Sequence, residues 1–306
     1  MSGAETVVVT GRPARLLFVH AHPDDESLAT GVAIAHHLAA GDEVHVLTCT
    51  LGEQGEVIPP ELAHLDADHE DTLGAFRRDE LRGAMTAIGA ASTVLGEDPE
   101  VGRLSRWRDS GMAGTPGADD PRAWVRSDDD EAIEAVGEVI ARLSPDVVVT
   151  YDAHGGYAHP DHIRTHEVTR RALATMDAAQ RPVLYGTFTP RSWAQEDRRV
   201  LTGLLSDVPG LAALGWTPPT GDFPPSVVDD AVVTHAVVDE DAVAGQVAAL
   251  RHHRTQVTLG PERTYALSND VAALLPGREG YARLDVRTGE PVPADPGTRP
   301  GLVVRR

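Results

Sequence analysis

Short apolar segments of strand length alternate with helix-length segments in this chain, and this alternation constrains the fold more than any other feature. The strand-like runs lie at residues 15–22, 44–50, 92–95 and 145–151, and the helical patterns lie at 27–40, 76–88, 129–143 and 161–176. Alternating strands and helices are typical of a parallel sheet that is covered by helices. We therefore predict an α/β fold with a Rossmann-like, doubly wound, mostly parallel sheet.

The chain of 306 residues is predicted to form a single domain with two parts. Residues 1–186 form the Rossmann-like core, and residues 187–306 form a smaller C-terminal subdomain packed beside the sheet. The second part is less regular, with an expected strand at 231–238 and an expected helix at 241–253. The Pro- and Gly-rich tail beyond Pro291 is expected to be loosely held.

Composition excludes several classes of function. The net charge of −20 argues against binding to nucleic acid, whose phosphates it would repel. Every basic residue is arginine, so Schiff-base chemistry and a P-loop lysine are excluded. The apolar runs are too short to span a membrane, and residues 1–12 do not resemble a secretory signal. With Cys49 as the single cysteine no internal disulfide can form, which favours a cytoplasmic location.

Two motifs rich in histidine and aspartate follow predicted strands. Residues 22–26 read His-Pro-Asp-Asp-Glu after the first strand, and residues 159–162 read His-Pro-Asp-His after the fourth. In a sheet of order 3-2-1-4-5 these two strands are neighbours where the winding reverses, and ligands bind at the carboxyl ends of strands at such a point. We therefore expect the two motifs to face each other across one crevice.

The residue types in these motifs suit a metal ion. Histidine and carboxylate are the usual ligands of a catalytic zinc, which keeps three protein ligands and one open position. A dinucleotide site is disfavoured, because no Gly-x-Gly-x-x-Gly follows the first strand. Taken alone, Asp24 and Asp25 could cap the next helix, and each histidine could be an ordinary loop residue. Together the two motifs favour a site.

These motifs resemble those of the LmbE-like de-N-acetylases, the family that includes the PIG-L deacetylase. The matching residues are 21–26 and 159–162. Within the family the chain is most similar to the branch that acts on N-acetylglucosaminyl-inositol in mycothiol biosynthesis. That narrower likeness rests on residues 27–28, 51–56, 106–112 and 154–162. The likeness runs from about residue 15 to residue 171 and returns weakly at residues 253–256.

The resemblance implies a role for each of ten residues. The metal ligands would be His22, Asp25 and His162. Asp24 would be the general base, and Tyr157 would polarise the acetyl carbonyl. His159 would be a positively charged partner of the tetrahedral intermediate and a proton donor to the leaving amine, and Asp161 would orient His159 or a ligand. Sugar and inositol hydroxyls would be bound by Arg77, Asp109 and, as a weaker candidate, Glu56.

The resemblance also implies the reaction and its cofactor. The expected activity is hydrolysis of the acetamide of N-acetylglucosaminyl-inositol with one Zn²⁺ per subunit, although two histidines and a carboxylate suit Fe²⁺ as well. A mycothiol S-conjugate amidase and a deacetylase of another N-acetylglucosaminide are the alternatives within this chemistry. A non-catalytic sugar-binding protein and a metal-dependent phosphoesterase are the alternatives from other classes. The expected partner is a small molecule, with no nucleic acid and no membrane, and the sequence leaves the oligomeric state open.

Overall fold

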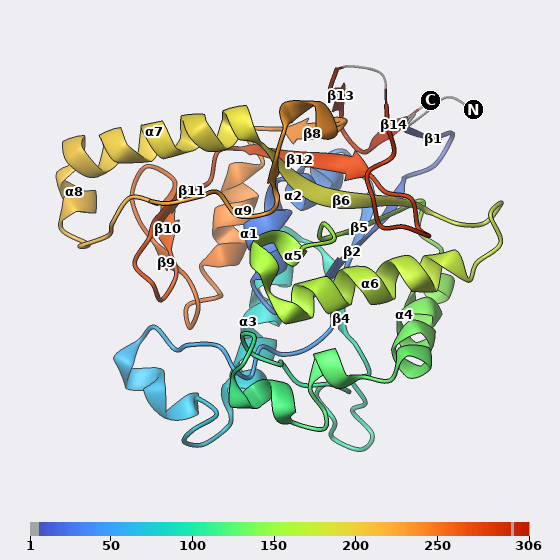
Figure 1. Cartoon of the computed structure of the whole chain (residues 1–306), viewed down its shortest axis with the longest axis horizontal. Coiled ribbons are helices and arrows are strands. Elements are labelled where there is room, and N and C mark those ends of the chain that lie inside the picture. The colour runs from blue at the N-terminus through green and yellow to red at the C-terminus, as the bar shows by residue number, and fades with distance from the viewer. Residues whose placement is uncertain (1–5, 295–296, 306) are drawn as a thin grey trace.

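A nine-stranded, mostly parallel sheet organises the protein (Figure 1). The computed structural model describes residues 6–294 and 297–305. The sheet order is β13-β8-β12-β6-β5-β2-β3-β4, and β7 pairs with β6 off this path. The parallel half contains β4 (Ala91–Val94), β3 (Glu43–Thr48), β2 (Arg15–His20), β5 (Val147–Thr150) and β6 (Val183–Pro190). This half has the predicted order, with β2 beside β5, and the α/β fold class is confirmed.

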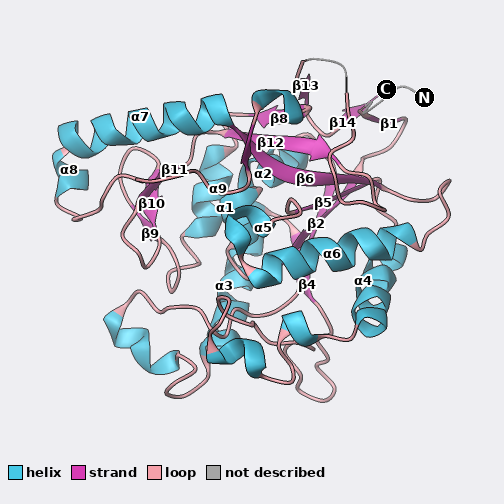
Figure 2. Cartoon of the chain, viewed as in Figure 1, coloured by secondary structure: helices cyan, strands magenta, loops and turns pink. Residues whose placement is uncertain are grey.

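Helices cover both faces of the sheet (Figure 2). They are α1 (Asp25–Ala29), α2 (Gly31–Ala39), α3 (Leu73–Ile88), α4 (Asp129–Leu143), α6 (Pro160–Ala174) and α9 (Val243–Leu250). Alternate strand residues point to opposite faces. Leu16 therefore packs in one apolar core with side chains of α2, α3 and α9. Its neighbour Leu17 packs in a second core with side chains of α4 and α6.

Local hydrogen bonds set where these helices begin and end. The Asp128 carboxylate accepts from the backbone N–H groups of Asp130 and Glu131, so α4 begins where the sequence predicts. The predicted helix at 27–40 is instead divided at Thr30 into α1 and α2. The Thr30 hydroxyl donates to the carbonyl of Glu26, and such a bond within a helix competes with its regular pattern.

The C-terminal part extends the same sheet rather than forming a separate layer. Strands β8 (His235–Val238) and β12 (Arg278–Arg283) join antiparallel to each other, and β12 pairs with β6. β13 (Arg299–Pro300) pairs with β8, and β7 (Val227–Val228) pairs with β6. The boundary placed after residue 186 falls inside β6, so the two predicted parts share one sheet.

An additional lobe lies at the left of Figure 1. It contains α7 (Arg191–Asp207), α8 (Pro209–Ala212) and a small sheet of β9 (Thr258–Leu259), β10 (Thr264–Ala266) and β11 (Ala272–Leu274). Its apolar cluster includes Leu201, Leu211 and Trp216. Sequence reasoning missed α7, because Leu201 is its single buried residue and the rest of the helix is largely polar.

The C-terminal tail is held more firmly than expected. β14 (Val303–Arg305) pairs with β1 (Val7–Val9), and the Arg305 guanidinium forms an ion pair with Asp42. Backbone pairing, which composition does not reveal, ties this segment down. Short 3₁₀ helices lie at Pro60–Leu65, Pro116–Asp119, Trp124–Arg126 and Asp230–Val232. Within the described ranges, no helix combines the length and apolar character needed to cross a membrane.

Candidate metal centre and active site

The two His-Pro-Asp motifs meet at the carboxyl edge of the sheet. Residues 22–26 follow β2 and lead into α1, while residues 152–162 follow β5 and contain the short helix α5 (Gly155–Ala158). Because β2 and β5 are adjacent parallel strands, both segments leave the sheet on the same side. Figure 1 shows α5 and the start of α6 beside α1 at this edge.

Three donor atoms at this edge form a nearly equilateral triangle. His22 Nδ1 lies 3.3 Å from Asp25 Oδ2 and 3.3 Å from His162 Nε2, and the last two atoms are also 3.3 Å apart. Ligands at about 2.05 Å from a tetrahedral ion are about 3.3 Å from one another. All three side chains are largely buried. The triangle therefore fits a metal ion, which these three side chains would hold.

Two carboxylates contact the ring nitrogen of His22 that faces away from the triangle. His22 Nε2 is 3.2 Å from Asp161 Oδ2 and 3.4 Å from Asp109 Oδ1. Burial opposes protonation of His22, but Asp109, Asp161 and Asp25 outweigh it and raise the pKa of the ring. A carboxylate that holds the proton on one ring nitrogen leaves the other free for a metal. The contact of Asp161 with His22 supports the prediction that Asp161 orients a ligand, which is one of the two roles expected for it.

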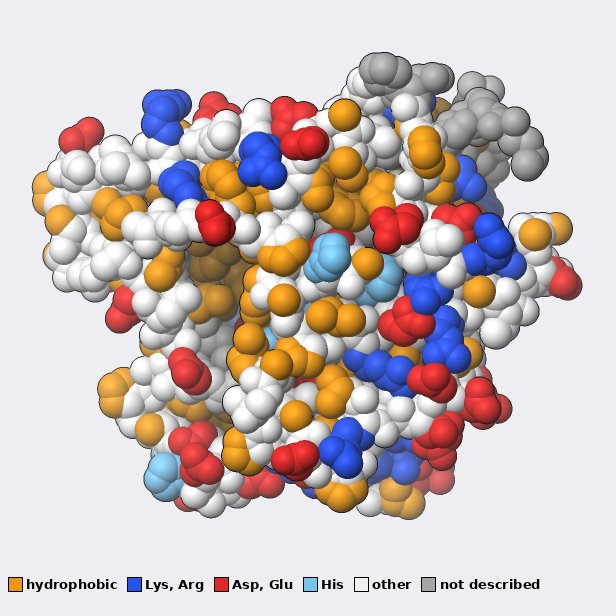
Figure 3. All heavy atoms as spheres, viewed as in Figure 1, with side chains coloured by type: hydrophobic (Ala, Val, Ile, Leu, Met, Phe, Trp, Pro, Cys, Tyr) orange, Lys and Arg blue, Asp and Glu red, His pale blue; other side chains and the backbone are white. Residues whose placement is uncertain are grey.

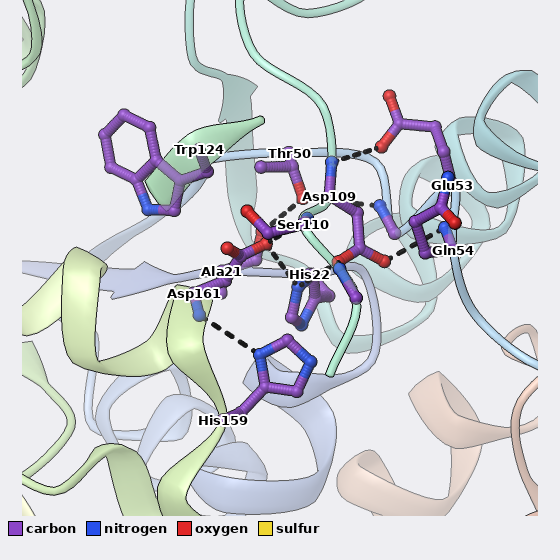
Figure 4. Close-up of polar contacts among 12 residues, drawn as sticks. Ala21, His22, Thr50, Glu53, Gln54, Asp109, Ser110, Trp124, His159 and Asp161 are labelled. Atoms are coloured by element: carbon purple, nitrogen blue, oxygen red, sulfur yellow. Dashed lines mark hydrogen bonds and ion pairs between the residues drawn. The ribbon is translucent and has the colours of Figure 1, made fainter. Parts of the chain in front are cut away.

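Asp109, expected to bind substrate, is buried next to the ring of His22. Its carboxylate accepts from the backbone N–H groups of Gln54 and Gly111, and its own N–H donates to Glu53 (Figure 4). With 4% exposure and with His22 beside Oδ1, Asp109 has little room to meet a sugar hydroxyl. These contacts favour support of His22, and binding of substrate by Asp109 stays an untested prediction.

Tyr151 contacts Asp25, the carboxylate of the triangle, and sequence reasoning missed Tyr151. The Tyr151 hydroxyl donates to Asp25 Oδ2 at 2.7 Å and accepts from the backbone N–H of Ala21. Its ring stacks on the ring of His162 at 4.1 Å between centroids. Its position directly after β5, at the edge where the motifs meet, was the available signal.

Other combinations of these side chains also place ligand atoms close together. One group joins His22, His159 and His162, and another joins His22 with Asp109 and Asp161. In the second group the carboxylates of Asp109 and Asp161 both face His22 Nε2, where a carboxylate can accept a hydrogen bond from the ring N–H. In the triangle that includes Asp25 all three mutual distances are 3.3 Å, the spacing expected around an ion, so it is the better candidate.

Asp24 lies beside the triangle in a strained backbone conformation. Its φ is 120°, a region that non-glycine residues rarely adopt and that costs about 1–3 kcal/mol. Burial raises the pKa of Asp24 to about 6, although Arg77 pulls it down. Strain of this kind is concentrated at functional sites, and a carboxylate with a pKa near 6 suits proton transfer at neutral pH.

Arg77 contacts the strained turn that carries Asp24. Its guanidinium donates to the carbonyls of Pro23 and Gly52 and lies 3.1 Å from Asp24 Oδ2. A Cβ on Gly52, whose φ is +63°, would lie 1.8 Å from Arg77, so only glycine fits there. The side chain of Arg77 is 3% exposed, which favours support of Asp24, and the contact with sugar hydroxyls stays an untested prediction. Glu56, the weaker candidate, lies exposed at the surface, with its carbonyl accepting from Gln256.

Glu26 and His253 form a buried pair that sequence reasoning missed. Glu26 Oε1 lies 2.8 Å from His253 Nε2, and Glu26 Oε2 accepts from the backbone N–H of Asp24 at 2.9 Å. Burial alone would raise the pKa of Glu26, but His253 lowers it to about 2. The return of family likeness at residues 253–256 was the available signal. The pair connects the C-terminal part of the chain to the turn that carries Asp24.

The surroundings of His159 favour a neutral ring over a positively charged one. Its Nδ1 accepts from the backbone N–H of Asp161 at 3.2 Å, so the proton of the ring resides on Nε2 (Figure 4). Burial lowers the pKa of His159 to about 3, and a bound cation would lower it further. This favours a neutral hydrogen-bond donor, and the positively charged partner stays an untested prediction. Tyr157, which is 55% exposed, lies at 5.9 Å from His159 between ring centroids.

A cavity of about 390 Å³ leads from the triangle to the surface. Asp25 and His162 of the triangle line it together with Tyr157, and residues of β6, α7, β10 and β12 line the remainder. Figure 3 shows the surface hollowed between α5 and the β9–β11 sheet, with apolar side chains around the opening. The volume falls within the range of pockets that bind small molecules.

Comparison with known proteins identifies the class of this chain. The family described as PIG-L, GlcNAc-PI de-N-acetylase, matches residues 17–173. The chain belongs to this family, and it is a deacetylase-family hydrolase by the name of that family and of its curated relatives.

Particular relatives are similar over almost the whole chain. It is 45% identical over 289 residues to a 1D-myo-inositol 2-acetamido-2-deoxy-alpha-D-glucopyranoside deacetylase of Mycolicibacterium smegmatis, covering 92% of each chain. It is 45% identical over 290 residues to the protein of the same name from Nocardia farcinica, covering 93% of each. A solved A40926 pseudoaglycone deacetylase is 21% identical, with a TM-score of 0.45, covering 80% of this chain and 83% of that one. The assignment rests on the family and the curated relatives.

Proposed function

We propose that the protein hydrolyses the acetamide of N-acetylglucosaminyl-inositol, 1D-myo-inositol 2-acetamido-2-deoxy-alpha-D-glucopyranoside, to acetate and the free amine in mycothiol biosynthesis. The observation that carries the proposal is the triangle of metal donors beside Asp24, two of which, Asp25 and His162, line a cavity. The substrate class follows from the names of relatives that are 45% identical over most of the chain.

His22, Asp25 and His162 would hold one divalent ion. Two histidines and one carboxylate suit Zn²⁺, which we propose as the physiological ion, and they also suit Fe²⁺. When bound, the ion lowers the pKa of water and polarises the acetyl carbonyl. The 3.3 Å spacing of the donors and the carboxylates behind His22 support this assignment.

The side chains around the triangle would carry the proton transfers. Asp24 accepts a proton as the oxygen of water bonds to the acetyl carbon, a role typically worth ~10²–10⁴-fold in rate. The carbonyl oxygen gains negative charge and is stabilised by hydrogen bonds from His159 Nε2–H and the Tyr157 hydroxyl. The proton then passes from Asp24 to the nitrogen as the C–N bond breaks. Acetate and the amine of the sugar leave.

Two alternatives differ in what they predict. A mycothiol S-conjugate amidase would use the same residues on a bulky acylcysteine in place of the acetyl group. A non-catalytic sugar-binding protein would not need Asp24 in a strained conformation with a raised pKa. That strain and the full set of donors favour an enzyme.

The test is release of acetate and of free amine from N-acetylglucosaminyl-inositol by zinc-loaded protein, beside cleavage of a mycothiol S-conjugate. We expect kcat/KM to be at least tenfold higher for the acetylated sugar. Preference for the S-conjugate would assign the chain to the amidase reaction. Stable metal binding with no cleavage of either amide would refute the proposed reaction.

A further inference from the structure

The outer part of the cavity is built by the C-terminal half of the chain, and its polar residues have no part in the proposed chemistry. Trp193 and Asp197 reach it from α7, and Arg278 reaches it from β12. These three side chains form a cluster at the wall of the cavity that Asp25 and His162 also line, and none of the three belongs to the donor triangle.

The cluster is ordered by its own contacts. Arg278 Nη2 lies 2.5 Å from Asp197 Oδ1, and Arg278 Nη1 lies 2.8 Å from Glu196 Oε2. The guanidinium carbon is 5.0 Å from the centroid of the Trp193 ring. An arginine held by two carboxylates and an indole is fixed before any ligand arrives. Burial raises the pKa of Asp197, although Arg278 opposes the rise.

Hydroxyl groups line the same wall. Thr187, Ser226 and Tyr265 border the cavity, and their side-chain oxygens have no hydrogen-bond partner among the described residues. Asp197 also keeps Oδ2 without a protein donor in that part of the chain. Partly buried donors and acceptors of this kind suit a ligand with several hydroxyl groups, because each unpaired group is stabilised by a partner.

The cavity that runs between the donor triangle and the α7 and β12 wall indicates how the substrate would lie. The scissile amide must lie at the donor triangle, and its acyl side is only a methyl group. The sugar ring and its aglycone therefore extend along the cavity, away from Asp25 and His162. The part of the substrate farthest from the amide then reaches the α7 and β12 wall.

We propose that Trp193, Asp197 and Arg278 form the subsite that recognises the polyhydroxylated aglycone of the substrate, a cyclitol ring. This inference rests on the proposed function, since it places the acetamide at the triangle. The indole offers an apolar platform for the C–H face of the ring, the Asp197 carboxylate accepts from a ring hydroxyl, and Arg278 holds that carboxylate in place. The C-terminal half of the chain thereby determines which N-acetylglucosaminide is accepted.

The chain offers a matched control for Asp197. Glu196 is the neighbouring residue and also bonds Arg278, but it does not line this cavity. Asp197→Asn and Glu196→Gln each remove one negative charge from the same arginine without changing size. A role limited to holding Arg278 predicts similar effects from both variants, whereas a role in contacting the aglycone predicts an effect from Asp197→Asn alone.

The experiment compares kcat/KM for N-acetylglucosaminyl-inositol with kcat/KM for the methyl glycoside of N-acetylglucosamine, which lacks the cyclitol. For Asp197→Asn we expect about a tenfold loss on the inositol substrate, mainly in KM, and less than a twofold change on the methyl glycoside. Glu196→Gln should change both by less than twofold. Trp193→Ala should behave like Asp197→Asn, and Trp193→Phe should recover part of the loss.

Equal losses on both substrates, no loss on either, or an equal effect of Glu196→Gln would overturn the subsite. A wild-type protein that releases no acetate from either substrate would refute the proposed function instead. In that case the subsite is decided by calorimetric titration of N-acetylglucosaminyl-inositol into the wild type and Asp197→Asn. Binding weakened about tenfold by the variant supports it, and equal binding overturns it.

Discussion

The carboxylate of Glu26 and the imidazole of His253 form an ion pair of 2.8 Å in which both side chains are completely buried. The second oxygen of Glu26 accepts from the backbone N–H of Asp24, the residue with the strained φ of 120°. Burial opposes a positive charge on His253, but Glu26 outweighs it and raises the pKa of His253. The pair therefore holds the turn of the proposed general base from the other end of the chain.

Replacing Glu26 by glutamine tests this positioning role. One amide oxygen cannot accept from both His253 and the N–H of Asp24, so the strained turn loses a restraint. We expect kcat to fall about tenfold with KM and metal content unchanged, and the free energy of unfolding to fall by about 1–3 kcal/mol. Steady-state kinetics, elemental analysis and urea denaturation measure the three quantities.

The exposed Glu138→Gln on α4 is the control and should match the wild type. A Glu26→Gln protein with normal kcat and lowered stability would limit the pair to a structural role.

Replacing Asp161 by asparagine tests the support of the metal site. Asp161 faces His22 Nε2 at 3.2 Å, and an asparagine supplies no negative charge to hold that proton. Loss of such a partner typically weakens metal affinity by about 10–100-fold. The dissociation constant for Zn²⁺, measured by competition with a chelating dye, should rise by that factor. Asp152→Asn should leave it unchanged, because this buried carboxylate in the same segment accepts from the backbone N–H groups of His154 and Gly156 and from no other donor in the described part of the chain.

His235 should make the protein sensitive to mild acid. Burial, with Arg299 and Arg283 nearby, lowers the pKa of His235 from 6.5 to about 4. Between these values the unfolded chain binds a proton that the folded protein does not, so this residue lowers stability as pH falls from 6.5 to 4, with no further loss below. His235→Asn should therefore show a shallower fall of Tm across this window than the wild type. Parallel curves for the two proteins would contradict the assignment.

The sequence predicts best the features that depend on local pattern. The helix at 129–143 is found at the predicted residues, because its amphipathic pattern and its Asp128 cap are both local. The neighbouring strands β2 and β5 follow from the rule for doubly wound sheets. By contrast, α7 was missed, because its long polar surface resembles that of a loop and its packing depends on distant residues.

The residues of the candidate site also fall into those that the sequence predicts and those that it does not. Motif residues such as His22 and His162 are visible in the sequence, because two short segments carry them. The supporting residues are not, because Tyr151 meets Asp25 and His253 meets Glu26 only in the folded chain. Arg77 is visible in the sequence, but its burial beside Asp24 is not.

The most direct test of this account is the metal content and turnover of Asp24→Asn after loading with zinc. The central claim is that His22, Asp25 and His162 hold the ion while Asp24 moves the proton. The account predicts one zinc per chain by elemental analysis, as in the wild type, with acetate release from N-acetylglucosaminyl-inositol reduced by ~10²–10⁴-fold. A metal-free variant would make Asp24 a ligand, and a metal-loaded variant with normal turnover would show that it is not the base.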